Sequence, residues 1–203
     1  MTDTNTLPLV ARSLAAALAG DPFYRTISVA SSDAACRLER LARYFEHSIT
    51  EGRTIGDVTC AGDSGAAIWI TSHDTRLLQQ ARDKKLAAIA EVLGPAGFAN
   101  YQSMVAAMEH NLPTAIAPAC WYLSILGVAP DSRNRGIGGS LLSPMLRKAD
   151  ALSTPCFLET FNPRSIPFYQ RLGFAVIETL VEPLTGAPYQ VMLRTPPKAR
   201  LAA

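Results

Sequence analysis

The sequence has little of several features that assign a protein to a class at once. Its 203 residues include four scattered cysteines without a CxxC pair and three histidines, none of them at zinc-ligand spacing. Lysine and arginine (19) nearly balance aspartate and glutamate (17), so a net charge of +2 offers no broad surface for nucleic acid or membrane. The N-terminus lacks a signal pattern, and no apolar run reaches membrane length. We therefore expect a reduced, cytoplasmic protein without a metal.

The composition is that of a folded domain. Hydrophobic residues make up 48% of the chain and charged residues 18%, which excludes general disorder. We find no internal repeat and no composition shift that would mark a linker. The sequence therefore predicts one domain over residues 1–203, with its core at about 7–195 and a mobile tail at 196–203.

Hydrophobic periodicity predicts an alternation of helices and strands. Apolar residues at helical spacing predict helices over residues 7–20, 33–50, 77–93, 98–110, 136–152 and 166–173. Short apolar or alternating runs predict strands over residues 65–72, 120–129, 154–161, 174–183 and 189–195. Strand–helix–strand order in the second half favours an α/β (α+β) fold with helices layered on a sheet.

A glycine cluster stands where one of these strands ends and the next helix begins. It contains Gly136, Gly138 and Gly139, with Arg133 and Arg135 just before and beside it. The free N–H groups and the dipole at a helix start favour an anion, and glycine lets the backbone approach a phosphate closely. The two arginines would add positive charge suited to a pyrophosphate. A tight turn with solvated arginines is the alternative at this point.

Two other phosphate loops fit the cluster less well. A Walker A loop requires GxxxxGK[ST], which is absent. A dinucleotide fingerprint requires glycine at the sixth position from Gly136, where Leu141 stands, although Glu159 lies at a plausible ribose-binding distance. The loop also comes late in the chain and leaves little room for a second βαβαβ half.

Two short motifs carry a resemblance to a known family. The segment VAPDSRNRGIGGSLL contains RxxGxG at Arg133, Gly136 and Gly138, and NPRSIPFYQRLGF follows one strand later. In this order and spacing they resemble the acyl-CoA loop and the second signature of the GCN5-related N-acetyltransferase (GNAT) superfamily. The layout of nearly the whole chain resembles the puromycin N-acetyltransferase type, with a looser match over residues 50–119.

The resemblance implies the GNAT fold. We expect a mixed, mostly antiparallel central sheet that is splayed between its fourth and fifth strands and flanked by helices. Only about six residues precede the first predicted helix, so the family's first strand is missing or very short. An uncovered sheet edge invites pairing, and a homodimer is one way to cover it.

The resemblance also implies an activity, the transfer of acetyl from acetyl-CoA directly to an amine of a small molecule through a tetrahedral intermediate. Tyr169 is the expected general acid that protonates the departing thiolate. Glu159, at the end of the fifth strand, is the candidate base, and His110 is the other one. A non-catalytic acyl-CoA-binding regulatory module and the acetylation of a protein amine are the alternatives.

The expected site residues fall into two groups. Gly127 inside a strand predicts a bulge or splay that frees backbone groups for acetyl-CoA. The expected acetyl-CoA contacts are Leu126, Gly127, Val128, Arg133, Asn134, Arg135, Gly136, Ile137, Gly138, Gly139, Ser140, Asn162, Arg164 and Phe168. The expected substrate contacts are Asp21, Phe23, Tyr24, Trp69 and His110. The sequence does not name the acceptor amine.

Overall fold

The computed structural model describes residues 7–29, 31 and 33–197, so most of the predicted tail lies outside the described residues. Its elements in chain order are α1 (Leu7–Leu18), α2 (Pro22–Ile27), α3 (Ala34–Ile55), β1 (Gly56–Cys60), β2 (Gly65–Ile70), α4 (Thr75–His110), β3 (Trp121–Val128), the 3₁₀ turn η1 (Pro130–Ser132), α5 (Ile137–Ala151), β4 (Cys156–Thr160), the 3₁₀ turn η2 (Pro163–Ser165), α6 (Ile166–Arg171), β5 (Ala175–Val181) and β6 (Pro188–Arg194).

The six strands form one open sheet in the order β1-β2-β3-β4-β6-β5. Every neighbouring pair is antiparallel except β3 and β4, which run parallel. Those two strands pair only at Trp121–Cys156 and Tyr122–Phe157, and beyond this point they part. Strands β3 and β4 take the places of the fourth and fifth strands of the predicted sheet, whose numbering counts the family's first strand. The mixed, mostly antiparallel sheet with a splay between these two strands is therefore confirmed. The residues ahead of α1, where the family's first strand was expected to be missing or very short, lie outside the described residues. Among the described strands, β1 lies at one edge of the sheet.

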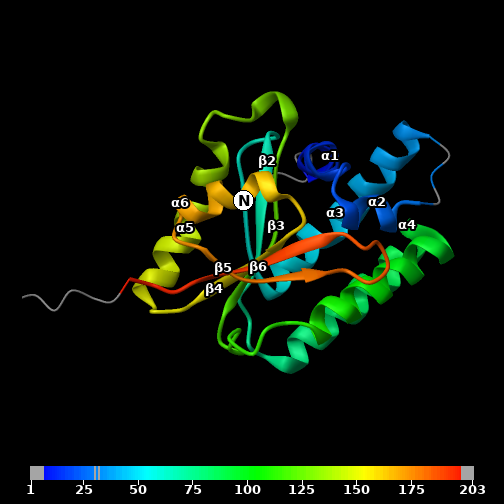
Figure 1. Ribbon diagram of the computed structural model, residues 1–203. Helices are drawn as coiled ribbons and strands as arrows, with labels where there is room; N and C mark the ends of the chain where they lie inside the picture. The colour runs from blue at the N-terminus through cyan, green and yellow to red at the C-terminus, as the bar shows by residue number, and fades with distance from the viewer. Residues whose placement is uncertain (1–6, 30, 32, 198–203) are drawn as a thin grey trace, which may run out of the picture.

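Helices cover both faces of the sheet and enclose two hydrophobic cores. Figure 1 shows α5 and α6 on one side of the strands and α3 and α4 on the other. One core lies between the four helices α1, α2, α3 and α4 and one face of β2 and β3, and it includes Leu14, Phe45 and Ile125. The other joins α5 and α6 with the opposite face, and includes Trp69 and Leu142.

Helix α4 is bent into two arms. Gly94 has a φ of +69° and is followed by Pro95, and both residues interrupt regular helix geometry. Arg82 in the first arm lies 2.8 Å from the carboxylate of Glu109 in the second, so the arms fold back against each other. The two helical segments predicted on either side of GPAG are thus confirmed.

A β-bulge in β3 decides which side chains face which core. Ile68 pairs with Ile125, but the next residue, Trp69, pairs with Leu123, so Ser124 is the extra residue. The extra residue shifts the alternation of side chains along β3, so the residues on either side of Ser124 point to opposite faces of the sheet, whereas a regular strand would point them to the same face. Leu123 consequently packs into the core under α5, whereas Ile125 packs into the core under α1 and α3.

Gly127 lies in the part of β3 that is splayed from β4, which was one of the two predicted alternatives, but the other alternative, a bulge at Gly127, is wrong. Gly127 pairs regularly with Ala66, and its lack of a side chain serves the packing of α1 instead. A Cβ on Gly127 would stand 2.7 Å from Leu14 Cδ2 and 3.3 Å from Ala17 Cβ, both in α1. Glycine therefore lets the end of α1 lie directly on β3.

Two features bear on metals and membranes. None of the helices among residues 7–29 and 33–197 has the length and apolar character that a bilayer crossing requires. The same residues contain no group of three or more histidine, cysteine, aspartate or glutamate side chains placed to hold a metal ion.

Candidate active site

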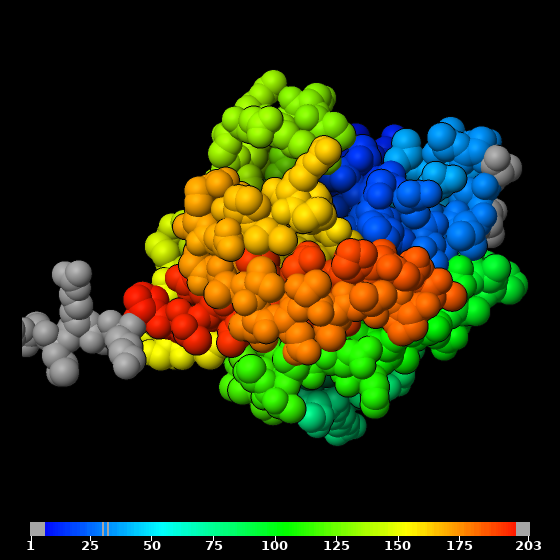
Figure 2. Space-filling model, viewed as in Figure 1, coloured from blue at the N-terminus to red at the C-terminus, as the bar shows by residue number. Residues whose placement is uncertain are grey.

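A large cleft passes through the gap where β3 and β4 part. It has a volume of about 1430 Å³ and is lined by residues 122–128 of β3 and by residues 157–162, which belong to β4 and the turn that follows it. The junction of α1 and α2, helix α3, both arms of α4, the end of β2, the start of α5 and residues within the segment 164–171 form the rest of its walls. In Figure 2 the blue N-terminal helices meet the orange to red band of the β5–β6 hairpin. The splayed strands therefore make a site at which segments far apart in sequence converge.

The glycine loop forms one end of this cleft. Gly136 has a φ of +78°, a left-handed conformation, and it precedes the first turn of α5 without a side-chain cap. A Cβ on Gly136 or Gly139 would meet no atom within 4 Å, whereas one on Gly138 would lie 3.2 Å from Phe168 Cζ. Open space beside a helix start with free N–H groups fits a pyrophosphate.

Arg133 lies in the cleft but is already engaged. Its Nε donates to the Val128 carbonyl at 3.2 Å, and one terminal nitrogen donates to the Ala17 carbonyl at 3.0 Å. The guanidinium thus ties the end of β3 to the end of α1, and it can offer a ligand only its remaining N–H groups. Asn134 and Ile137 also line the cleft, whereas Arg135 and Ser140 are exposed and do not.

The second signature shapes the wall that faces the glycine loop. The Asn162 side-chain oxygen accepts the Arg164 N–H at 3.1 Å and sets the turn that leads into α6. Phe168 packs edge-on against Tyr169, with ring centroids 5.1 Å apart. All four residues line the cleft together with Leu126, Gly127 and Val128 from β3. The structure therefore gathers the predicted acetyl-CoA residues of both motifs, apart from Arg135 and Ser140.

Tyr169 reaches the same cleft from α6. Only 9% of the residue is exposed, and burial, with a further contribution from the Asp21 charge, raises the pKa of its phenol well above the usual value. Its hydroxyl makes no hydrogen bond to any other residue in the described ranges. A neutral phenol without an internal partner is a proton donor available to a ligand.

Glu159 stands at the end of β4 on the opposite wall. Burial raises its pKa to about 7, the hydrogen bond from the Tyr122 hydroxyl to Oε2 (3.2 Å) opposes this rise, and the Glu109 charge adds to it. Its other oxygen, Oε1, is buried and has no hydrogen-bond partner among the described residues. A carboxyl group with a pKa near neutrality can take up and release a proton at physiological pH.

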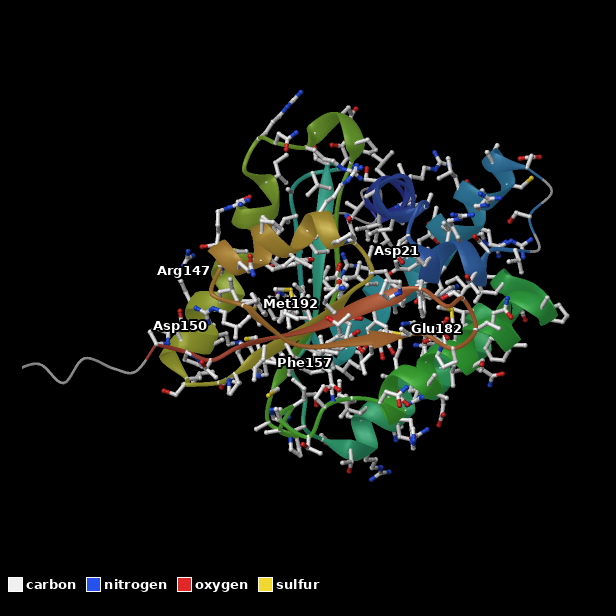
Figure 3. All side chains as sticks on the ribbon, in the orientation of Figure 1. Asp21, Arg147, Asp150, Phe157, Glu182 and Met192 are labelled. Carbon is white, nitrogen blue, oxygen red and sulfur yellow. The ribbon has the colours of Figure 1, made fainter. Side chains whose placement is uncertain are left out.

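Asp21 lies at the start of α2, among the N-terminal helices (Figure 3), and its charge acts on Tyr169. Its Oδ1 accepts the Phe23 N–H at 2.9 Å and caps the helix. Burial raises its pKa to about 6, against the lowering effect of the backbone hydrogen bonds. Phe23 and Tyr24 line the cleft beside it, so the three predicted substrate residues of this loop lie together.

The other two predicted substrate residues do not lie in the cleft. Trp69 is fully buried in the core under α5, and its ring N–H has no partner among the described residues. His110 is exposed at the end of α4. Neither residue belongs to the cleft lining, so Glu159 alone of the two candidate bases is in place.

Sequence reasoning missed a set of buried side chains behind Glu159. Tyr44 and Glu51 of α3, Lys85 and Tyr101 of α4 and Tyr122 of β3 line the inner part of the cleft. The Lys85 ammonium lies 2.6 Å from Glu51 and 5.5 Å from the centre of the Tyr44 ring. These residues come from three separate elements, and no local motif marks them.

Comparisons with known proteins agree with this fold. The sequence model of the Acetyltransferase (GNAT) family matches residues 60–174. A Corynebacterium glutamicum structure described as histone acetyltransferase HPA2 and related acetyltransferase is similar over 98% of this chain and 96% of its own, with a TM-score of 0.65 and 20% identity. Arylalkylamine N-acetyltransferase 2 from Aedes aegypti is similar over 95% of each chain, with a TM-score of 0.60 and 14% identity. The family match covers more than half of the sequence, and the chain therefore belongs to the GNAT acetyltransferase family.

Proposed function

We propose that this protein is an N-acetyltransferase that moves acetyl from acetyl-CoA directly to the amine of a small molecule. The observation that carries the proposal is the meeting of three parts in one cleft. The glycine loop at the start of α5, the phenol of Tyr169 and the carboxyl of Glu159 all line the gap between β3 and β4. Each part supplies one requirement of thioester aminolysis.

The glycine loop would hold acetyl-CoA, which supplies the thioester. Gly136 and Gly139 leave open space at the first turn of α5, where backbone N–H groups meet a pyrophosphate without an intervening side chain. Phe168 closes the other side of the loop against Gly138. The narrowing gap between β3 and β4 leads from this loop to Glu159 and Tyr169.

Glu159 is proposed to accept the proton that an ammonium must lose before its nitrogen can attack. Its pKa of about 7 leaves the base form predominant just above neutrality. Activity should therefore rise with pH through about 7 and level off above it. A base of this strength still takes up a proton readily, which a carboxyl at its ordinary pKa of 4.5 does not.

Tyr169 is proposed to donate its phenol proton to the sulfur as the tetrahedral intermediate collapses. The C–N bond forms, the C–S bond breaks, and the proton still on nitrogen restores the phenol. General acid catalysis of this kind contributes about 10²–10⁴-fold to a rate. The raised pKa of Tyr169 keeps the donor protonated throughout the range in which Glu159 is ionised.

The test is a thiol-release assay with acetyl-CoA and a panel of small amines, with mass spectrometry to identify the amide. We expect release that depends on both acetyl-CoA and an amine. Acetyl-CoA binding without release from any amine in the panel would overturn the proposal in favour of a non-catalytic acyl-CoA-binding module.

A further inference from the structure

The half of the cleft formed by α2, α3 and α4 with Tyr122 and Glu159, called the acceptor pocket below, has an unequal balance of charge. Two basic side chains line it, Arg82 and Lys85. Four carboxylates line it, those of Asp21, Glu51, Glu109 and Glu159. This excess bears on which acceptor the pocket can take.

Both bases are committed to two of the carboxylates. The Lys85 ammonium lies 2.6 Å from Glu51, and its side chain is only 9% exposed. Arg82 meets Glu109 through two hydrogen bonds of 2.8 and 3.1 Å. Neither cation is thus available to pair with a carboxylate of a ligand.

The other two carboxylates have no basic partner in the described part of the chain. Asp21 accepts the Phe23 N–H, and Glu159 accepts only the Tyr122 hydroxyl. When ionised, they give the pocket two negative charges that no basic side chain of the described residues balances. Such a site attracts the ammonium group of a ligand and repels a ligand that also carries a carboxylate.

The walls between these charges are aromatic. Phe23 packs edge-on against Tyr24 and Tyr101, with centroids 5.3 and 6.1 Å apart, and Tyr44 packs against Tyr24 and Tyr101 at 6.0 and 6.1 Å. The hydroxyl groups of Tyr24 and Tyr101 have no hydrogen-bond partner among the described residues. Rings that contact one another edge to face present a surface that suits a further ring and a neighbouring cation.

We propose that the acceptor is an amine with an aromatic group on a short arm and without a carboxylate, an arylalkylamine rather than an amino acid or an aliphatic amine. The ammonium would lie at Glu159, with Asp21 adding negative charge to the same cleft, and the ring would lie against Phe23, Tyr24 and Tyr101. This inference rests on the proposed function and names its substrate class. Glu159 takes one proton from the ammonium, and the nitrogen then bonds to the acetyl carbon. The C–S bond breaks as the sulfur takes the Tyr169 proton, a second nitrogen proton restores the phenol, and Glu159 releases its proton to water after the product has left.

The proposal is tested by equilibrium binding of three amines to the full-length protein, with and without coenzyme A, by calorimetry. The amines are 2-phenylethylamine, phenylalanine, which adds a carboxylate to the same frame, and n-butylamine, which lacks the ring. We expect 2-phenylethylamine to bind at least about 10-fold more tightly than either of the others, since like charge and lost ring contact each cost more than 1 kcal/mol. Equal or tighter binding of phenylalanine or n-butylamine, or no binding of any of the three, would overturn the proposal.

A pair of variants locates the ring. Tyr101→Phe keeps the ring and should bind 2-phenylethylamine within about twofold of the natural protein, whereas Tyr101→Leu should lose about 5- to 30-fold. n-Butylamine binding should be the same in both variants, which separates loss of the ring contact from loss of the fold. Equal 2-phenylethylamine binding by the two variants would contradict the assignment.

The binding assay is independent of turnover. Selective 2-phenylethylamine binding without thiol release would uphold the substrate class and refute the proposed catalysis. Thiol release with phenylalanine or n-butylamine in preference to 2-phenylethylamine would uphold the catalysis and refute the substrate class.

Discussion

Removal of the Tyr122 hydroxyl should move the pH dependence of catalysis in a known direction. The Tyr122→Phe change deletes the hydrogen bond of 3.2 Å to Glu159 but keeps the ring, which stacks on Phe157 with centroids 4.6 Å apart. That bond stabilises the ionised carboxylate and so lowers the pKa of Glu159. A hydrogen bond to a charged group contributes about 1.5–3 kcal/mol, and this long bond should contribute about the lower value. One pKa unit corresponds to about 1.36 kcal/mol, so loss of the bond should raise the pKa of Glu159 by about one unit.

The measurement is the pH profile of kcat/KM. The acidic limb, expected near pH 7 in the natural protein, should move up by about one unit in Tyr122→Phe, with the plateau at high pH largely retained. Tyr189→Phe is the matched control because its hydroxyl has no partner among the described residues, although it interacts with the Glu159 charge. An unmoved limb in Tyr122→Phe, or an equal shift in both variants, would refute the assignment of the limb to Glu159.

Three further predictions concern stability and cofactor binding. The pKa of Glu159 is about 7 in the folded protein against an ordinary value of 4.5, so the folded protein loses stability as pH rises from about 4.5 to 7. In urea denaturation, Glu159→Gln should therefore be more stable than the natural protein by up to roughly 3 kcal/mol at pH 8 and equally stable at pH 4. Arg194→Ala, which breaks a partly buried bidentate ion pair, should lower stability by about 3 kcal/mol, whereas Arg12→Ala, from an exposed pair, should cost less than about 1 kcal/mol. Equal losses of stability in denaturant would contradict this. Gly136→Ala and Gly62→Ala strain similar left-handed glycines, but only Gly136→Ala should weaken acetyl-CoA binding in calorimetry, and a matching loss in Gly62→Ala would refute the loop's role.

The second half of the chain could be predicted because its determinants are local. The RxxGxG motif and the segment from Asn162 to Phe174 each specify a turn and the helix that follows, and both are contiguous in sequence. Helix boundaries followed from capping and glycine: Asp33 caps α3 as predicted, and α4 bends at Gly94. Strand β1 and the short helix α2 were missed, because neither has an apolar pattern long enough to stand out.

The remaining features depend on contacts between distant segments. The bulge at Ser124 changes the face of β3, yet no residue type marks it, whereas Gly127 attracts attention for a different reason, the approach of α1. Arg133 has the motif position of a phosphate ligand, but its partners include a carbonyl 116 residues away, at Ala17. The Lys85–Glu51 pair, which lines the acceptor pocket, likewise joins two helices. Sequence periodicity identifies each of the two residues only as a polar position and does not predict that they meet.

The carboxylates of Asp150 and Glu182 differ from that of Glu159 in how their oxygens are hydrogen-bonded. Figure 3 marks Asp150 on α5 and Glu182 at the turn between β5 and β6, both outside the cleft. Asp150 pairs with Arg194, and Glu182 accepts two backbone N–H groups and the Thr185 hydroxyl. Each is satisfied by its own neighbours, unlike Glu159, whose Oε1 has no partner among the described residues. An unsatisfied buried carboxyl oxygen is the signal that sets Glu159 apart.

The most direct test of the account compares Tyr169→Phe with the natural protein in two assays on the same samples. Acetyl-CoA binding by calorimetry should change by less than about threefold, since the ring that packs against Phe168 and Phe174 is kept. Amine-dependent thiol release should fall by about 10²–10⁴-fold, the contribution of a general acid. Undiminished thiol release from Tyr169→Phe, at natural acetyl-CoA affinity, would contradict the central claim that this phenol protonates the departing sulfur.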